Sequence, residues 1–140
     1  MSQLQIAGVY RLVIRSDKDI LESLLAWANE NQVTAARFKG SGMLKSATMG
    51  FFHQVEKELT TLRVNKPVEL INLTGDISEK SGLTEVTGKI TIADPEHKVM
   101  GGGLVKGNKA FSVEVFIDVF ENGSLKRVFE SQTGLSTWAE

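Results

Sequence analysis

Apolar and polar residues alternate along most of the chain, a pattern that predicts a protein built mainly of β-strands. In residues 7–15, Tyr10, Leu12 and Ile14 would share one face of a strand. The clearest strand covers residues 109–121. One of its faces carries apolar side chains at every second position: Phe111, Val113, Val115, Ile117 and Val119. Its other face still contains two phenylalanines, so we expect a second layer or a neighbouring subunit to cover part of it.

Further strands are predicted wherever short apolar or alternating runs lie between residues that favour turns. They cover residues 33–39, 43–52, 55–64, 67–74, 84–93, 98–105 and a short segment near 125–129. The separating turns are expected at Gly40–Gly42, at Asn65–Pro67, at residues 78–82 (SEKSG) and at residues 121–124 (ENGS).

One segment has helical periodicity instead. In residues 16–32 (SDKDILESLLAWANENQ), Asp19 is followed three residues later by Glu22, which is typical of a capped helix start. The apolar positions that follow recur at helical spacing: Ile20, Leu21, Leu24, Leu25 and Ala28. The predicted fold is therefore α+β: a strongly bent, barrel-like, mainly antiparallel sheet with one main helix near the N-terminus. Residues 1–140 are expected to form a single domain.

The overall composition narrows the possible functions. The chain has 140 residues, with 16 basic and 17 acidic side chains, and this balance differs from that of a domain that holds phosphates mainly by charge. Without cysteine it has no disulfide, thiolate nucleophile or thiolate metal ligand. Neither a signal peptide nor a membrane span is recognisable, so we expect a cytoplasmic protein without a membrane partner.

Two glycine-containing segments fail as phosphate-binding motifs. Residues 39–46 (KGSGMLKS) have Lys45 where a dinucleotide-binding fingerprint needs its third glycine, and they lead into strand-like sequence. We interpret them as a tight turn. Residues 102–107 have the glycine spacing of a P-loop, but Asn108 stands where its lysine is required.

The two histidines, His53 and His97, are too far apart in sequence to bind a metal from one element, and no nucleophile elbow is present. The sequence therefore predicts no metal site, no cofactor and no catalytic residue. Glu69 and Glu114 lie in apolar strands, and two readings remain open for them. They either face solvent or pair with a cation, or they line a cleft where burial would suit them to proton transfer, with Lys39 and Lys89 as cationic partners.

Three consecutive glycines, residues 101–103, interrupt a strand-like segment. Glycine weakens a strand interior, so either the backbone turns sharply there or another group approaches it closely.

Four segments carry a resemblance to a known family. They are residues 19–52 (DILESLLAWANENQVTAARFKGSGMLKSATMGFF), 66–78 (KPVELINLTGDIS), 90–107 (ITIADPEHKVMGGGLVKG) and 110–121 (AFSVEVFIDVFE). In this order they resemble the plants-and-prokaryotes conserved (PPC or PCC) domain, also described as a PD1-like candidate DNA-binding domain, over about residues 8–137. Glu69 matches the glutamate of a Gly-Arg-Phe-Glu-Ile-Leu signature in plant relatives.

The resemblance implies a homotrimer with clefts between its subunits. Many prokaryotic relatives bind a metal through a His-x-His pair and a third histidine after two glycines, and the corresponding positions here are Thr87, Lys89 and Gly103. The resemblance thus implies the scaffold of that site without its ligands, with Gly101 and Gly102 as closely approached backbone beside the cleft. Lys89 either replaces the metal's charge and attracts an anion, or the site has decayed.

Plant relatives bind A·T-rich DNA through a separate Arg-Gly-Arg-Pro hook, and this tetrapeptide does not occur in the sequence. Three functions follow: a trimeric regulatory module associated with DNA or a partner protein, a small-molecule (anion) or enzyme-like cleft similar in architecture to acetolactate decarboxylase, or a structural trimer. We favour the first. The candidate cleft residues are Lys39, Ser41, Glu69, Thr87, Lys89, Gly101, Gly102, Gly103 and Glu114.

Overall fold

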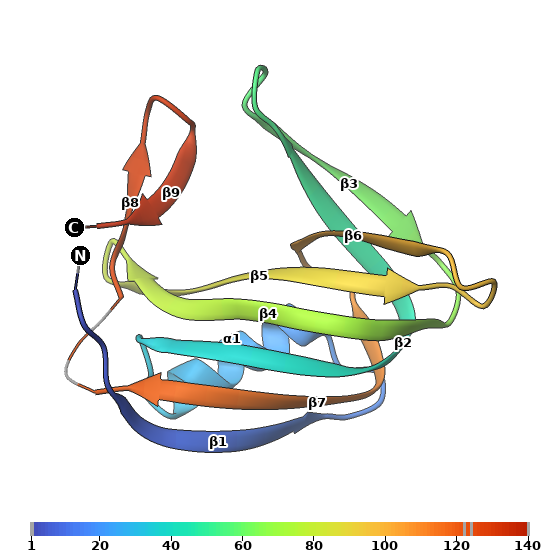
Figure 1. Ribbon diagram of the computed structural model, residues 1–140, viewed down its shortest axis with the longest axis horizontal. Coiled ribbons are helices and arrows are strands. Elements are labelled where there is room, and N and C mark those ends of the chain that lie inside the picture. Colours follow the sequence, from blue (N-terminus) through green and yellow to red (C-terminus); the bar gives the residue numbers. More distant parts are fainter. Residues whose placement is uncertain (1, 122, 124, 140) are drawn as a thin grey trace.

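One helix packs against one face of a long, curled antiparallel sheet (Figure 1), which confirms the predicted α+β class. The computed structural model describes residues 2–121, 123 and 125–139. Its elements are β1 (Ile6–Ile14), α1 (Ile20–Glu30), β2 (Ala36–His53), β3 (Glu58–Val64), β4 (Val68–Lys80), β5 (Leu83–Ala93), β6 (Val99–Leu104), β7 (Lys109–Phe120), β8 (Arg127–Glu130) and β9 (Leu135–Trp138). In the described part of the chain, no helix has the length and hydropathy to cross a membrane.

The sheet curls until its last strand meets its central one again. Its strand order is β1-β7-β2-β4-β5-β6, and β3 pairs with the far half of β2. β6 also pairs with β2, through Met49 opposite Leu104 and Gly50 opposite Gly103. Four strands, β2, β4, β5 and β6, therefore form a closed ring, and the predicted strong bend of the sheet is confirmed.

Two of the three consecutive glycines are needed for this closure. A Cβ atom on Gly102 would lie 2.6 Å from the Gly50 carbonyl oxygen, and one on Gly101 would lie 2.8 Å from the Ile90 carbonyl oxygen. Both distances are shorter than real Cβ contacts. At Gly103, in contrast, the nearest atom would be 3.6 Å away, an ordinary contact. The close approach of backbone thus explains Gly101 and Gly102 but leaves Gly103 without a packing reason.

The predicted turn at Gly40–Gly42 is wrong, because residues 36–53 form the single strand β2. These glycines instead allow β2 to pass very close to the backbone of β7. A Cβ atom on Gly40 would lie 2.6 Å from the Glu114 carbonyl oxygen, and one on Gly42 would be closer still to that of Ser112. The pairing of β2 with β4 is irregular at this point, so the strand bends across β7 without ending.

Several other boundaries differ from the prediction. β4 continues to Lys80 rather than ending at residue 74, and the chain turns at Ser81 and Gly82, which both have positive φ. β9 was not predicted, and it pairs with β8 to form a terminal hairpin. The predicted turn at residues 121–124 includes residues 122 and 124, which lie outside the described residues.

The helix is fixed at its start by one aspartate. Asp19 Oδ2 accepts a hydrogen bond from the Glu22 amide at 3.0 Å, which confirms the predicted cap. Asp19 Oδ1 also accepts bonds from the amides of Gly107 and Asn108, at 2.8 and 2.9 Å. Asn108 itself is fully buried and bonds to the backbone of Thr48 in β2. The segment that resembles a P-loop is therefore a structural turn joining α1, β2 and β7.

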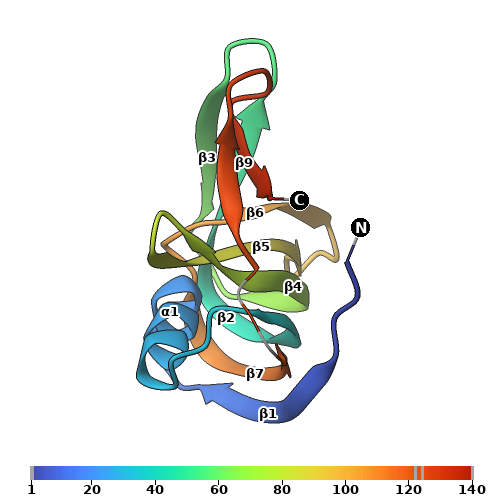
Figure 2. The same ribbon diagram turned by 90° about the vertical axis from the view of Figure 1, so that its left-hand side faces the viewer.

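One face of α1 supplies the cover for the sheet. Ile20, Leu24 and Ala28 are buried and belong to the same core as Phe38 and Ile90 in the sheet. Seen from the side, the helix lies against one side of the sheet, and the two hairpins rise above the sheet (Figure 2).

The contrast between Gly102 and Gly103 yields a prediction about stability. We expect Gly102→Ala to lower the free energy of unfolding by about 1–3 kcal/mol, because its new Cβ would push β6 away from β2. Gly103→Ala should leave it unchanged or raise it by up to about 1 kcal/mol, because alanine restricts the unfolded chain. Urea unfolding of both variants provides the measurement. Equal losses in the two variants would contradict the closure described here.

Candidate functional site

The face of the sheet opposite α1, called the open face below, collects most of the predicted site residues. Directly paired residues of antiparallel strands point to the same side of a sheet. Lys39 on β2 is paired with Phe116 on β7 and with Thr74 on β4. Thr74 is paired in turn with Lys89 on β5, and Lys89 with Gly103 on β6. Lys39 and Lys89 therefore lie in one row across the open face.

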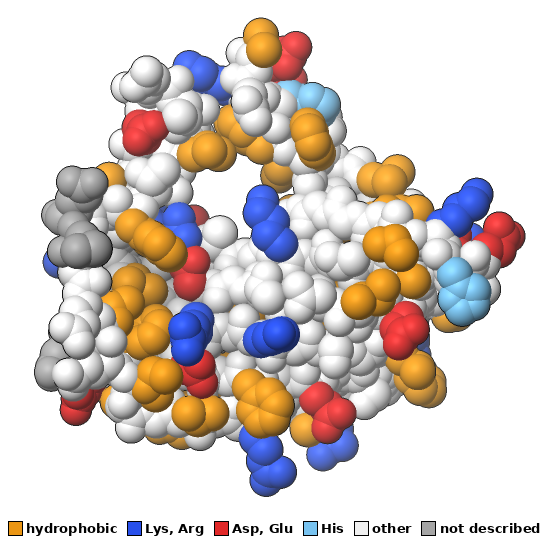
Figure 3. Space-filling model, viewed as in Figure 1, with side chains coloured by type: hydrophobic (Ala, Val, Ile, Leu, Met, Phe, Trp, Pro, Cys, Tyr) orange, Lys and Arg blue, Asp and Glu red, His pale blue; other side chains and the backbone are white. Residues whose placement is uncertain are grey.

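Arg11 on β1 extends this row, since it is paired with Phe116. Arg11, Lys39 and Lys89, called the cationic row, are all exposed, and none forms an ion pair with a described residue. Because each is two strands from the next, their backbones are about 10 Å apart. Basic side chains are visible across this face in Figure 3. The row is a strip of cations that have no ion-pair partner among the described residues.

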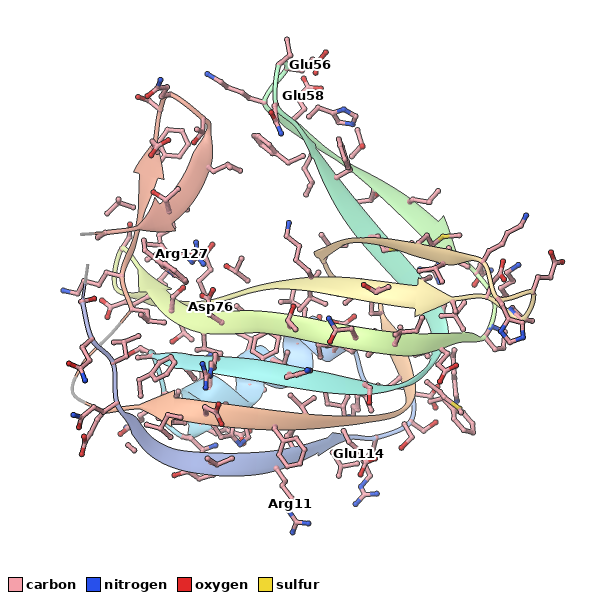
Figure 4. The ribbon with its side chains drawn as sticks, viewed as in Figure 1. Arg11, Glu56, Glu58, Asp76, Glu114 and Arg127 are labelled. Atoms are coloured by element: carbon pink, nitrogen blue, oxygen red, sulfur yellow. The ribbon has the colours of Figure 1, made fainter. Side chains whose placement is uncertain are left out.

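A groove of about 800 Å³ lies over the β1, β7 and β2 part of the open face. Its lining includes Arg11, Lys39, Ser41, Glu114 and Phe116. Ser41 is directly paired with Glu114. In Figure 4, Arg11 and Glu114 lie at the β1–β7 border of the sheet. This groove thus combines two cations, one carboxylate and an exposed aromatic ring.

Two hairpins rise above the β5–β6 side of the sheet, one from each end of the strands, and lean toward each other (Figure 1). The long hairpin consists of residues 47–64 of β2 and β3, and the terminal hairpin consists of β8 and β9. They meet near their tips, where Lys57 Nζ donates to the Ser131 carbonyl oxygen at 3.4 Å. In the space-filling view an opening is visible between them (Figure 3).

A cavity of about 940 Å³ lies beneath these hairpins and is called the hairpin cavity. Lys89 and Gly101–Gly103 contribute to it from the sheet. The remaining lining comes from the two hairpins: Gly50, Phe51, Phe52, Gln54, Gln132, Thr133 and Leu135. Four of the predicted site residues therefore lie in this one cavity.

A largely buried ion pair holds the terminal hairpin to the sheet, and nothing in the sequence pattern predicted it. Arg127 donates to Asp76 Oδ2 at 2.8 Å, and the two side chains are only 11% and 15% exposed. The two residues point toward each other from β8 and β4 (Figure 4). Arg127 also donates to the Ser136 carbonyl oxygen and stacks on Trp138 at 5.5 Å. Arg127 thereby helps to hold the terminal hairpin beside the hairpin cavity, together with the backbone bond from Glu79 to Leu125.

The remaining predicted residues lie elsewhere on the open face. Glu69 borders a third hollow, of about 430 Å³, together with Met43 and Phe111. Thr87 lines none of these three hollows and is paired with Asp76. Among the described residues, neither Glu69 nor Glu114 forms an ion pair with Lys39 or Lys89. Within one chain, the candidates therefore share a face of the sheet but occupy separate hollows.

Asp94, at the border of the third hollow, is a structural carboxylate. It accepts hydrogen bonds from the amides of Lys98 and Glu96, both at 2.9 Å, and lies 3.7 Å from Lys66 Nζ. The bond from the Lys98 amide, followed by that from Glu96 and the charge of Lys66, lowers the pKa of Asp94. The carboxylate therefore remains ionised and stabilises the β5–β6 turn.

The three positions that the resemblance assigns to a metal site, Thr87, Lys89 and Gly103, lie close together on the sheet. Lys89 is paired with Gly103, and Thr87 lies two residues before Lys89, so all three point to the same side of the sheet. Their side chains offer no set of metal ligands. Within residues 2–121, 123 and 125–139, no group of three or more His, Cys, Asp or Glu side chains is placed to hold a metal. His53 contacts Thr60 at 2.8 Å, and His97 lies in the β5–β6 turn.

Comparisons with known proteins agree with this geometry. Residues 1–121 match the model of the Plants and Prokaryotes Conserved (PCC) domain, and the chain belongs to this family. A metal-containing protein of Archaeoglobus fulgidus is 25% identical, with a TM-score of 0.92 over 99% of this chain and 97% of its own. A plant- and prokaryote-conserved protein of Pyrococcus horikoshii is 24% identical, with a TM-score of 0.93 over 100% and 96%. A search of curated proteins found no match.

Restoring ligands provides a test of the three metal-ligand positions. The wild-type protein should bind no stoichiometric zinc, whereas the triple variant Thr87→His, Lys89→His, Gly103→His should bind one zinc per chain, since three imidazoles on one sheet face form a competent ligand set. Metal content after dialysis can be measured by atomic emission. Stoichiometric zinc in the wild type, or none in the triple variant, would contradict the assignment of these three positions to the scaffold of a metal site.

Proposed function

We propose that this protein is a DNA-associated regulatory module that acts as a homotrimer and contacts the nucleic-acid backbone through Arg11 and Lys39 of the cationic row. The observation that supports this most is the alignment of these cations on an exposed sheet face, where none of them forms an ion pair with a described residue. Cations without acidic partners attract phosphates and release counterions on binding. The exposed ring of Phe116 lies between Arg11 and Lys39, where a base or sugar can pack on it.

Proteins of the same fold point in the same direction. Structures from Ralstonia eutropha and Bacteroides thetaiotaomicron, 23% and 20% identical to this chain, bear the names of candidate DNA-binding proteins. The sequence contains no Arg-Gly-Arg-Pro hook, and its net charge is −1. DNA binding by this chain would therefore depend on a local row of cations rather than on a basic domain, and it should be weak and strongly dependent on salt.

Exposed apolar side chains support the homotrimer. Both hairpins carry large apolar residues on their surfaces: Phe51, Val55, Leu59, Leu62, Val128, Phe129, Leu135 and Trp138. Phe51 is 65% exposed and Phe129 is 63% exposed. A two-stranded hairpin is at best marginally stable alone, and monomers rarely expose contiguous apolar patches of this kind. Further copies of the chain would bury the members of this set that lie outside the hairpin cavity, which Phe51 and Leu135 line, and would thereby stabilise the two hairpins.

The second candidate function, a binding site for a small anion, is supported by the hairpin cavity and by Lys89 within it. No described residue is assigned a catalytic role under either function.

Fluorescence anisotropy with A·T-rich and mixed-sequence duplexes, at low and physiological salt, tests the DNA proposal. We expect salt-dependent binding by the wild type. The double variant Arg11→Gln, Lys39→Gln should bind more weakly to both duplexes. The slope of log K against log salt should fall by about 2, because each lost phosphate contact accounts for about 0.9 of that slope.

The matched control is Lys18→Gln, which removes an exposed lysine beside the start of α1 and should leave binding unchanged. Sedimentation of the same sample should give the mass of three chains. No DNA binding at low salt would reject the DNA proposal, and a single-chain mass at micromolar concentration would reject the trimer.

A further inference from the structure

The hairpin cavity is lined almost entirely by uncharged residues. Eleven residues line it, and Lys89 is the only charged one among them. We infer that this cavity binds a small organic anion that has an apolar part, with Lys89 as the partner of its anionic group. This inference rests on the second candidate function above and adds the class of its ligand, and it depends on residues other than the proposed DNA contacts.

Lys89 has no ion-pair partner among the described residues at the base of the cavity. Its partners across the sheet are Thr74 and Gly103, and its neighbours on the same face of β5 are Thr87 and Thr91. All four are neutral, and no described carboxylate forms an ion pair with Lys89. Lys89 is exposed within the cavity, so an anion can reach it directly, and the two hairpins supply further contacts that an open surface would lack.

Gly103 leaves space beside this charge. Packing does not require glycine at residue 103, since an added Cβ would meet its nearest neighbour at 3.6 Å. Gly101 and Gly102 differ, because backbone atoms would lie within 3.0 Å of a Cβ there. A side chain at residue 103 would point to the same side as Lys89 and fill the base of the cavity. The absence of a side chain therefore keeps the ammonium group accessible.

The residues that line the walls of the cavity indicate which kind of ligand it can bind. Gln54, Gln132 and Thr133 supply hydrogen-bonding groups from the two hairpins, and Phe51 and Leu135 are among its apolar lining residues. A volume of about 940 Å³ is within the range of small-molecule sites. A carboxylate or a phosphate on an aromatic or aliphatic body fits this combination of groups.

A polymer fits the cavity less well than a small molecule. The hairpins meet near their tips, through Lys57 and Ser131, so they frame the cavity from above. A nucleic-acid backbone would have to thread between them, whereas a small anion can enter through the opening visible in Figure 3. The hairpin cavity therefore suits an effector, and the groove with Arg11 and Lys39 remains the candidate DNA contact.

Isothermal titration with benzoate and with phenyl phosphate, using benzyl alcohol as the neutral analogue, tests this inference on the intact wild-type protein. We expect saturable binding of at least one anion and much weaker binding of benzyl alcohol. Lys89→Gln should weaken anion binding at least about tenfold, as expected for loss of a charge-assisted hydrogen bond. Gly103→Leu should abolish it by filling the cavity base, and Lys18→Gln should leave it unchanged.

Saturable binding of either anion would support the inference. The anion with the higher affinity would then indicate whether the site prefers a carboxylate or a phosphate. Three results would overturn it: no saturable binding of either anion at millimolar concentration, equally tight binding of benzyl alcohol, or unchanged affinity in Lys89→Gln. Urea unfolding of Lys89→Gln confirms that a loss of affinity does not come from a loss of fold. The DNA measurements on the Arg11→Gln, Lys39→Gln variant test different residues, so failure of the anion inference and failure of the DNA proposal can be told apart.

Discussion

The pairing of β6 with β2 determines the shape of this protein. It converts an open antiparallel sheet into a closed ring of β2, β4, β5 and β6. The two backbones approach so closely that Gly102 has no room for a side chain. A side chain at this position would push β6 away from β2 and weaken their pairing, and unpaired strand edges are prone to association with other chains.

The closure also determines where binding can take place. α1 covers one face of the sheet, so the opposite face is left for function (Figure 2). β2 continues beyond the ring into the long hairpin, and the largely buried pair of Arg127 and Asp76 holds the terminal hairpin opposite it. The hairpin cavity lies where the ring and the two hairpins meet, and Gly103 and Lys89 are neighbours at its base. The groove with Arg11 and Lys39 lies further along the same face.

The sequence predicted the elements that local patterns determine. Alternation identified β7, and helical spacing with Asp19 identified α1. The segment Gly40–Gly42 was misread, because glycine has the same sequence signature in a tight turn and in a strand that crosses another backbone closely. Only long-range pairing with β7 distinguishes the two. The Arg127–Asp76 pair joins residues 51 positions apart, and no local pattern reveals it. Lys39 and Lys89 were recognised as candidates, but their common row depends on strand register.

The account depends most on the closure of the sheet by β6 and β2, and residue-resolved amide hydrogen exchange tests it most directly. The backbone amides shared by Met49–Gly50 and Gly103–Leu104 should exchange as slowly as those between β2 and β4, since both sets belong to one cooperative core. If the β2–β6 amides exchanged as fast as those of the exposed turn at residues 54–57, the ring would be open. The base of the hairpin cavity would then not exist as described.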